Sequence, residues 1–183
     1  RDLFVSAATH AGVNATRNLY LTRGITRATI KRNDAVLPPE DPRSPERLVD
    51  VMLAIAEGPR TIVRSVTFEG GEALPEGRLR DLVPVEAGQP YSESDVITAR
   101  DVLELEYRNL GYDGVVISPE ISLADGDTQA DVTFEITEGQ QSIVDHIIIL
   151  GNERTSTETI RHELVLGEGD PRGYAALIES RAR

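Results

Sequence analysis

The sequence has no cysteine and no tryptophan, and its 183 residues include one methionine and one lysine. Without cysteine the chain can form no disulfide, no Cys-ligated zinc site and no catalytic thiol. The missing thiols suit a reducing compartment and an oxidising one equally. The three histidines, His10, His146 and His162, lack a metal-ligand spacing such as i, i+4 with a glutamate. We therefore expect surface histidines, no metal site and no cofactor.

Positive charge and long apolar runs are also scarce. The chain carries 19 basic against 31 acidic residues, a net charge of −12. Binding to nucleic acid needs clustered lysine and arginine, so nucleic acid is not an expected partner. No apolar run approaches the roughly 18 to 20 residues of a membrane helix, and no basic-then-apolar leader opens the chain. We expect this segment not to span a membrane.

An internal repeat is the strongest positive signal. Residues 56–71 and 137–152 share apolar and turn residues at a constant offset of 81. The matched pairs are Glu57-Gly58 with Glu138-Gly139, Ile62-Val63 with Ile143-Val144, Val66 with Ile147, Phe68 with Ile149, and Gly70 with Gly151. A fixed offset that holds over several residue types indicates tandem modules.

Before the first copy, the chain predicts one helix and two strands. Apolar residues at spacings of three and four predict a helix over residues 1–23, ending at Gly24. Ile25–Ile30 reads as a short strand, and the proline-rich stretch Lys31–Glu46 reads as a polar connection. Leu48–Ile55 then predicts the answering strand.

The central part predicts strand, helix, helix, strand, strand. The strands are Val63–Phe68 and a hairpin that turns at Asp125-Gly126-Asp127, with Val115 and Ile117 before the turn and Val132, Phe134 and Ile136 after it. The helices are Pro75–Val83 and one that starts with a capping box at Ser92–Asp95, carries the apolar stripe Val96, Ala99, Leu103, Tyr107 and Leu110, and ends at Gly111. Ile143–Leu150 then predicts a strand, and a helix capped at Thr155–Glu158 runs through Leu166.

The flanks match parts of this unit. At an offset of 87, Tyr20 and Gly24 match Tyr107 and Gly111. The predicted division is a partial repeat at 1–61 with a second helix and hairpin, a complete repeat at 62–144, and a partial repeat at 145–183 with a first strand and helix. Each end exposes a face that its missing half would cover. We expect flanking residues to cover these faces, or a second molecule to complete them.

The order of these elements and several short motifs resemble the POTRA (polypeptide-transport-associated) repeats of an outer-membrane β-barrel assembly insertase or close relative. The motifs are Gly111-Tyr112, Glu138-Gly139, Ile147 to Gly151-Asn152, and the turn Leu166-Gly167-x-Gly169. The first copy departs from this pattern with Gly24-Ile25, and Gly70-Gly71 stands where Gly-Asn is expected. The resemblance implies an α+β fold of tandem POTRA-like β-α-α-β-β units, each a three-stranded mixed sheet with two helices packed on one face.

The resemblance also implies a function. In the family the last strand is central, which leaves the strand before the hairpin turn at an edge with unpaired backbone groups. Such an edge can accept an extended peptide as an extra strand. The expected peptide-binding edges are Val115, Val116, Ile117 and Ser118, with the matching Thr29, Ile30, Lys31 and Arg32.

Implied partners are unfolded outer-membrane proteins or assembly-complex subunits, together with the full-length chain's own C-terminal β-barrel. That barrel would tether a periplasmic, non-enzymatic array to the outer membrane. The alternative is a structural POTRA-like docking module of a division or secretion complex with one fixed folded partner.

Other patterns favour structural roles over ligand binding or catalysis. Asp125-Gly126-Asp127 with Asp131 lacks the length and terminal glutamate of a calcium loop, so a polar hairpin turn is expected. The glycines from Gly167 to Gly173 enclose a proline and two acids, which disfavours phosphate binding. No serine, histidine and aspartate are brought together by a hydrolase-type motif. Ile148 should face outward, where a contact with a neighbouring unit or partner and ordinary exposed apolar surface are equally expected.

Overall fold

A computed structural model describes residues 6–38 and 49–182. It separates into two compact units. The first unit comprises the described part of Arg1–Ser65, together with Ala87–Ser94 and Ser122–Asp131. The second unit comprises Val66–Glu86, Asp95–Ile121 and the described part of Val132–Arg183. The predicted boundaries at 61 and 144 stay a prediction, because these units divide the chain by contacts and not by repeats.

The first compact unit begins with a helix and a two-stranded sheet. Helix α1 spans Ser6–Thr22, and strands β1 (Thr29–Val36) and β2 (Val49–Ala56) pair antiparallel, with Thr29 opposite Ala56 and Val36 opposite Val49. The predicted helix is confirmed from Ser6 to Thr22 and the answering strand from Val49 to Ile55, while residues 1–5 and Leu48 of these predictions lie outside the described residues. Gly24, with φ of 80°, follows the helix in the left-handed region that favours glycine.

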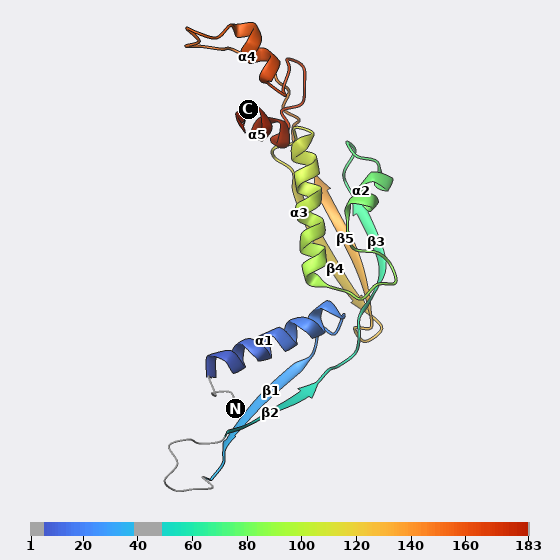
Figure 1. The fold of residues 1–183 in the computed structure, drawn as a ribbon. Helices are drawn as coiled ribbons and strands as arrows, with labels where there is room; N and C mark the ends of the chain where they lie inside the picture. The colour runs from blue at the N-terminus through green and yellow to red at the C-terminus, as the bar shows by residue number, and fades with distance from the viewer. Residues whose placement is uncertain (1–5, 39–48, 183) are drawn as a thin grey trace. The chain divides into compact units, whose positions relative to one another are not determined.

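The central segment forms a three-stranded sheet in the order β3-β5-β4 (Figure 1). The strands are β3 (Ile62–Glu69), β4 (Val116–Ala124) and β5 (Gln129–Thr137). Side-chain bonds advance together along β3 and β5, from Ser65 to Asp131 and from Thr67 to Thr133, so these two strands run parallel. Because β4 and β5 form a hairpin, the sheet is mixed with β5 central, as the resemblance implied.

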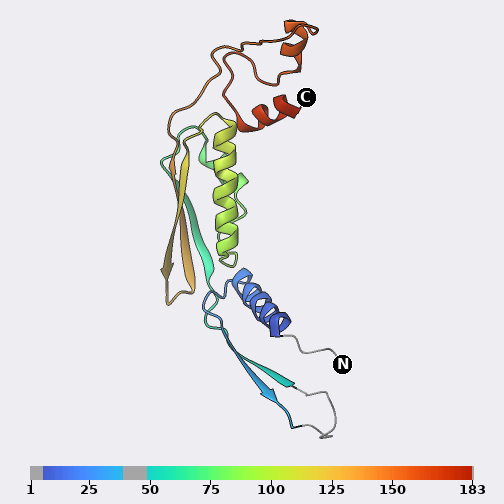
Figure 2. The same cartoon turned by 90° about the vertical axis from the view of Figure 1, so that its left-hand side faces the viewer.

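Helices α2 (Glu76–Leu82) and α3 (Glu93–Asn109) complete the α+β fold. Figure 2 shows α3 lying along one face of the sheet, and Arg78 of α2 bonds Glu106 of α3 at 2.8 Å. Four residues of the predicted stripe, Val96, Ala99, Leu103 and Tyr107, are buried, and the fifth, Leu110, is half-buried. The alternate strand residues Val115, Ile117, Val132, Phe134 and Ile136 are buried as well, so the predicted core is confirmed.

Strand β3 differs from the predicted simple alternation. Val63 and Val66 are both buried although they are three positions apart, while Arg64 and Ser65 between them lie on the accessible side. One residue is therefore inserted into the period of two, as in a β-bulge. The insertion lets Arg64 and Ser65 both reach Asp131.

The last part of the chain forms helices α4 (Thr157–Glu163) and α5 (Tyr174–Ala182). The side chain of Ser156 accepts a hydrogen bond from the Thr159 amide at 3.1 Å, which confirms the predicted cap. The predicted strand Ile143–Leu150 is wrong, because only Ile143 makes a bridge, to Pro171. Its counterpart β3 is a strand because it pairs with β5, and no described strand pairs with residues 144–150.

Three further boundaries differ from the prediction. The first strand starts at Thr29 instead of Ile25 and continues through Lys31–Val36, part of the predicted connection Lys31–Glu46, whose residues 39–46 lie outside the described ranges. The polar residues there fit a strand because the ladder with β2 satisfies their backbone while their side chains stay accessible. Helix α4 ends at Glu163, before Leu166, because Leu164 adopts an extended conformation with ψ of 132°.

Candidate functional site

The predicted peptide-binding residues of the central sheet lie at the start of β4. Val115 precedes the strand and is buried; Val116 is 57% exposed and Ile117 is 3% exposed. Ser118 is exposed, and Pro119 follows it inside the strand. Because β4 pairs with β5 on one side only, its other side is the edge of the sheet. The structure therefore places Val116, Ile117 and Ser118 on an edge strand and Val115 just before it, while their role in peptide binding stays a prediction.

The matching residues of the first compact unit, Thr29, Ile30, Lys31 and Arg32, open strand β1. Thr29 and Lys31 are exposed, whereas Ile30 and Arg32 are half-buried on the opposite face. Arg32 donates through Nε to Asp34 Oδ1 at 2.7 Å and lies 3.1 Å from Nδ1 of His10 in α1. The hydrogen bond from Arg32 lowers the pKa of Asp34. This face of β1 is thus tied to α1 by side chains.

The opposite edge of the central sheet is covered by chain that follows α2. Val63 of β3 donates to the Gln89 carbonyl at 2.9 Å, and the Gly88 amide donates to the Val63 carbonyl at 2.8 Å. Further along β3, Arg80 Nη2 reaches the Val66 carbonyl at 3.4 Å. These contacts occupy backbone groups of β3 that an added strand would need.

The face of the sheet away from α3 carries a small polar network. Asp131 accepts hydrogen bonds from both Nε and Nη2 of Arg64 and from the Ser65 hydroxyl. The bonds from Arg64 and then Ser65 lower the pKa of Asp131 from 3.8 to about 2. Thr67 and Thr133 pair through their hydroxyls at 2.9 Å. Asp131 is therefore a fixed anion that joins β3 to β5.

A tyrosine and a glutamate meet where α3 ends and β5 ends. The Tyr107 side chain is fully buried, and its hydroxyl lies against Gly71, where an added methyl group would be 2.4 Å away. Glu138 accepts hydrogen bonds from the amides of Glu72 and Ala73, both at 2.7 Å. Burial, and then the charge of Glu138, raise the pKa of Tyr107 to about 12. The pair fixes the loop after β3 against the end of the last strand.

Thr61 is the centre of a joint between the first hairpin and the central sheet. Its amide donates to the Gly24 carbonyl at 2.7 Å, its carbonyl accepts from the Tyr91 amide at 3.0 Å, and its hydroxyl donates to the Asp127 carbonyl at 2.6 Å. A methyl group added at Gly24 would lie 2.5 Å from the Thr61 oxygen. Close backbone approach therefore requires glycine at position 24.

The same joint recurs 81 residues later. Ser142 donates to the Gly111 carbonyl at 2.8 Å and accepts from the Arg172 amide at 2.8 Å. A methyl group on Gly111 would lie 2.6 Å from the Ser142 oxygen. The side chains that close the two joints also correspond, since Arg60 bonds the Arg23 carbonyl at 3.0 Å and Gln141 bonds the Leu110 carbonyl at 2.9 Å. This backbone arrangement supports the repeat interpretation of the offset.

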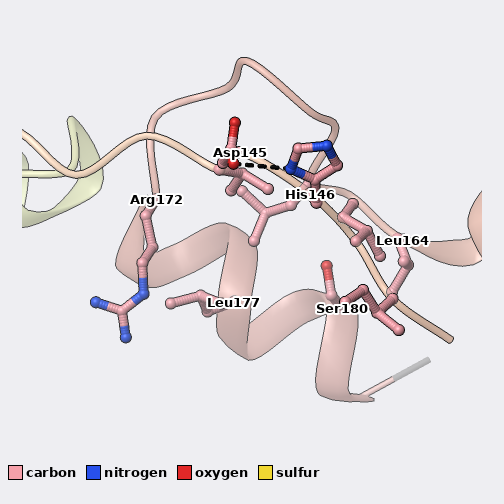
Figure 3. A pocket seen from close by; sticks show the side chains of 10 residues that line it. Asp145, His146, Leu164, Arg172, Leu177 and Ser180 are labelled. Atoms are coloured by element: carbon pink, nitrogen blue, oxygen red, sulfur yellow. Dashed lines mark hydrogen bonds and ion pairs between the residues drawn. The ribbon is translucent and has the colours of Figure 1, made fainter. Parts of the chain in front are cut away.

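The second compact unit contains a pocket of about 670 Å³ near its C-terminal helices (Figure 3). Its apolar lining includes Ile147, Leu164, Leu166 and Leu177. These residues lie 81 positions after Val66, Val83, Val85 and Val96, which are buried in the central segment. The apolar lining of the pocket thus corresponds in sequence to part of the central core.

The polar residues of this pocket do not form a catalytic set. Figure 3 shows His146 beside Asp145, with Nδ1 and Oδ2 2.7 Å apart, and both side chains are largely exposed. The Ser180 hydroxyl accepts a hydrogen bond from the Val165 amide at 3.0 Å, and Arg172 pairs with Asp113. Each polar group has a structural partner, so the arrangement offers no activated nucleophile.

The two remaining glycine-containing motifs form turns in the structure. Asp125, Gly126 and Asp127 all have positive φ and form the hairpin turn, and Asp127 pairs with Arg27. The Gly167 amide donates to Asp170 at 2.7 Å instead of pointing at an anion site. Within residues 6–38 and 49–182, no three His, Cys, Asp or Glu side chains gather as a metal site would require. In the same ranges, no helix has the length and apolar character to cross a membrane.

The comparison with known families bears on residues 61–139. They match the family model of POTRA, described as a surface antigen variable number repeat. The matched range coincides with the β-α-α-β-β segment and its mixed sheet in the order β3-β5-β4. Residues 61–139 form a POTRA domain.

Ile148, predicted to face outward in the following repeat, is 79% exposed.

Similar proteins agree with this assignment. The chain is 26% identical over 137 residues to the outer membrane protein assembly factor BamA of Nitratidesulfovibrio vulgaris, which covers 73% of this chain and 17% of that protein. Its fold is similar to POTRA domains 3–5 of Haemophilus influenzae BamA, with a TM-score of 0.57 and 18% identity over 100% of this chain and 70% of that one.

A second structure, Haemophilus ducreyi BamA lacking POTRA domains 1–3, gives a TM-score of 0.54 at 22% identity over 78% of this chain and 25% of that one. The chain thus spans a small part of its BamA relative.

The features around the predicted site that sequence reasoning missed are the β3 bulge, the Thr61 joint and Pro119 within β4. The proline was visible in the sequence, and its position two residues after the buried Ile117 was the available signal.

Proposed function

We propose that this chain is a periplasmic POTRA segment that binds unfolded outer-membrane proteins, or subunits of an assembly complex, by adding their extended segments to its sheet edges. The two candidate edges are Val115–Ser118 and Thr29–Arg32. One observation carries the proposal: in both sheets the strand before the hairpin turn, β4 or β1, lies at an edge. Backbone hydrogen bonds along an edge recognise an extended chain with little regard to its side chains.

The name of the N. vulgaris relative, an outer membrane protein assembly factor, supports the substrate class. A partner of this kind presents strands of about ten residues with alternating apolar side chains. The acidic charge of the chain, −12, disfavours binding to anionic membrane surfaces. In this proposal the chain holds an extended polypeptide and performs no chemistry on it.

N-methylated peptides give the test. An extended peptide of about ten alternating residues is titrated against the chain by fluorescence anisotropy. Two further versions are N-methylated at alternate positions, one on the odd and one on the even residues. Strand addition predicts that one set abolishes binding and the other leaves it nearly intact, because alternate amides point to opposite sides of a strand. Equal effects of both sets would contradict strand addition and favour docking of one fixed folded partner.

A further inference from the structure

We propose that Pro119 closes the β4 edge to extended peptides and that strand β1 is the edge that accepts them. This inference rests on the proposed function and decides which strand performs it. Pro119 lies in the fourth position of the nine-residue strand Val116–Ala124. In contrast, β1 has no proline among its eight residues, TIKRNDAV.

The side of β4 that Pro119 affects follows from the ladder. Proline has no amide hydrogen, so within a sheet it occupies edge strands with its nitrogen directed away from the neighbouring strand. Since β4 pairs only with β5, the Pro119 nitrogen is on the open side. Residues two apart share that side, so an added strand would meet the amides of Ile117 and Ile121 with a missing donor and a ring between them.

Pro119 therefore interrupts the row of backbone groups along the β4 edge. Before Pro119 the strand offers only Val116–Ser118, too short for the row of backbone bonds that an extended peptide makes. The pyrrolidine ring also occupies space that a strand must enter, since neighbouring strands lie about 4.8 Å apart. Proline on an edge strand is one of the devices by which proteins block unwanted strand addition.

The other edge of the same sheet is closed by different means. Gly88 and Gln89 bond the backbone of Val63, and Arg80 reaches the Val66 carbonyl. Both edges of the central sheet are therefore obstructed, one by a proline and one by chain and side-chain contacts. Strands β1 and β2 contain no proline, and no other segment among residues 6–38 and 49–182 makes a backbone hydrogen bond of this kind to them. Capture of an extended peptide is thus directed to this two-stranded sheet, in which β1 is the strand that corresponds to β4.

Photo-cross-linking on the 183-residue chain tests this assignment. The probe is the alternating ten-residue peptide of the previous section with a benzophenone side chain, and cross-linked sites are located by mass spectrometry. We expect cross-links on β1 and few on β4. Pro119→Thr should raise the β4 cross-links by about tenfold, since it restores one backbone donor and removes the ring. Glu120→Thr, which adds the same side chain but keeps Pro119, should leave them unchanged.

A second variant acts on β1. Ile30→Pro should reduce the β1 cross-links by about tenfold, while Ile30→Ala, which removes the same apolar contact but keeps the amide, should not. If Ile30→Pro unfolds the hairpin by circular dichroism, the Pro119→Thr comparison decides alone. Abundant β4 cross-links in the parent chain, or no gain in Pro119→Thr, would overturn the role of Pro119 while leaving strand addition standing. A parent chain that captures no peptide at either strand would overturn the proposed function as well.

Discussion

The Tyr20 hydroxyl donates a 2.9 Å hydrogen bond to Oε1 of Glu57, and Tyr107 and Glu138 stand at the matching positions 87 and 81 residues later. In both places a tyrosine near the end of a helix faces a glutamate of the turn after a strand. The later glutamate bonds the amides of Glu72 and Ala73, because in the central segment a loop after β3 lies within its reach. The hydrogen bond to Glu57 raises the pKa of Tyr20.

Ionisation of Tyr107 should destabilise the central segment at high pH. Its pKa is raised from 10.0 to about 12 in the fold, so the neutral hydroxyl contributes stability that is present below pH 10 and is lost as the pH rises toward 12. Phenolate absorbance should show one tyrosine titrating near pH 12 that is missing in Tyr107→Phe. An unchanged titration in that variant would contradict the assignment.

Leu103 should be the most sensitive position of the apolar stripe on α3. Its side chain is fully buried, so Leu103→Ala removes apolar contacts and leaves a cavity, at a cost of roughly 2 to 5 kcal/mol in the free energy of unfolding. Leu105 on the same helix is 47% exposed, and Leu105→Ala should change that free energy by less than about 0.5 kcal/mol. Urea denaturation compares the two, and equal costs would show that the phase of the helix is wrong.

Gly111 should be irreplaceable in the joint around Ser142. Gly111→Ala combines a positive φ of 87° with a methyl group 2.6 Å from the Ser142 oxygen. Gly88 has a similar φ of 90°, but no atom lies within 4 Å of an added methyl group. Gly88→Ala should therefore cost only the left-handed strain of about 1 to 2 kcal/mol, and Gly111→Ala more. Hydrogen exchange of the Ser142 amide should accelerate in Gly111→Ala alone.

Acid should weaken the attachment of β3 to β5. Because the bonds from Arg64 and Ser65 lower the pKa of Asp131 from 3.8 to about 2, its contribution to stability is present above pH 3.8 and is lost as the pH falls toward 2. Asp131→Asn should be less stable at neutral pH and should show a shallower loss of stability between these values. Parallel acid-unfolding curves for the parent and Asp131→Asn would refute this role.

The sequence predicted most of the central segment because local signals and burial agree there. Alternate apolar residues such as Val132, Phe134 and Ile136 predict one buried face of a strand, and Leu103 and Tyr107 predict the buried face of α3. The two apolar faces were therefore expected to pack against each other. The repeat offset then linked Tyr20 with Tyr107 before any contact was known. Where several signals coincide in this way, one interpretation satisfies all of them.

The errors share one physical cause, since strands depend on partners that are distant in sequence. Residues 143–150 have a strand-like pattern, yet Ile143 alone makes a bridge because no described strand pairs with the rest. Lys31–Val36 lacks an apolar alternation, yet pairing with β2 makes it a strand. The joint around Thr61 could not be predicted either, because every group in it except the Thr61 hydroxyl belongs to the backbone of residues 24, 61, 91 and 127 and carries no sequence signal.

Amide hydrogen exchange by NMR, with and without the alternating peptide, tests the central claim most directly. Strand addition to β1 predicts new protection on every second amide between Thr29 and Val36, because only alternate amides of a strand face its edge. Amides of Val116–Ser118 should change little while Pro119 is present. Protection that appears instead at Leu164, Leu166 and Leu177, the residues of the C-terminal pocket, or no protection at saturating peptide, would contradict the account.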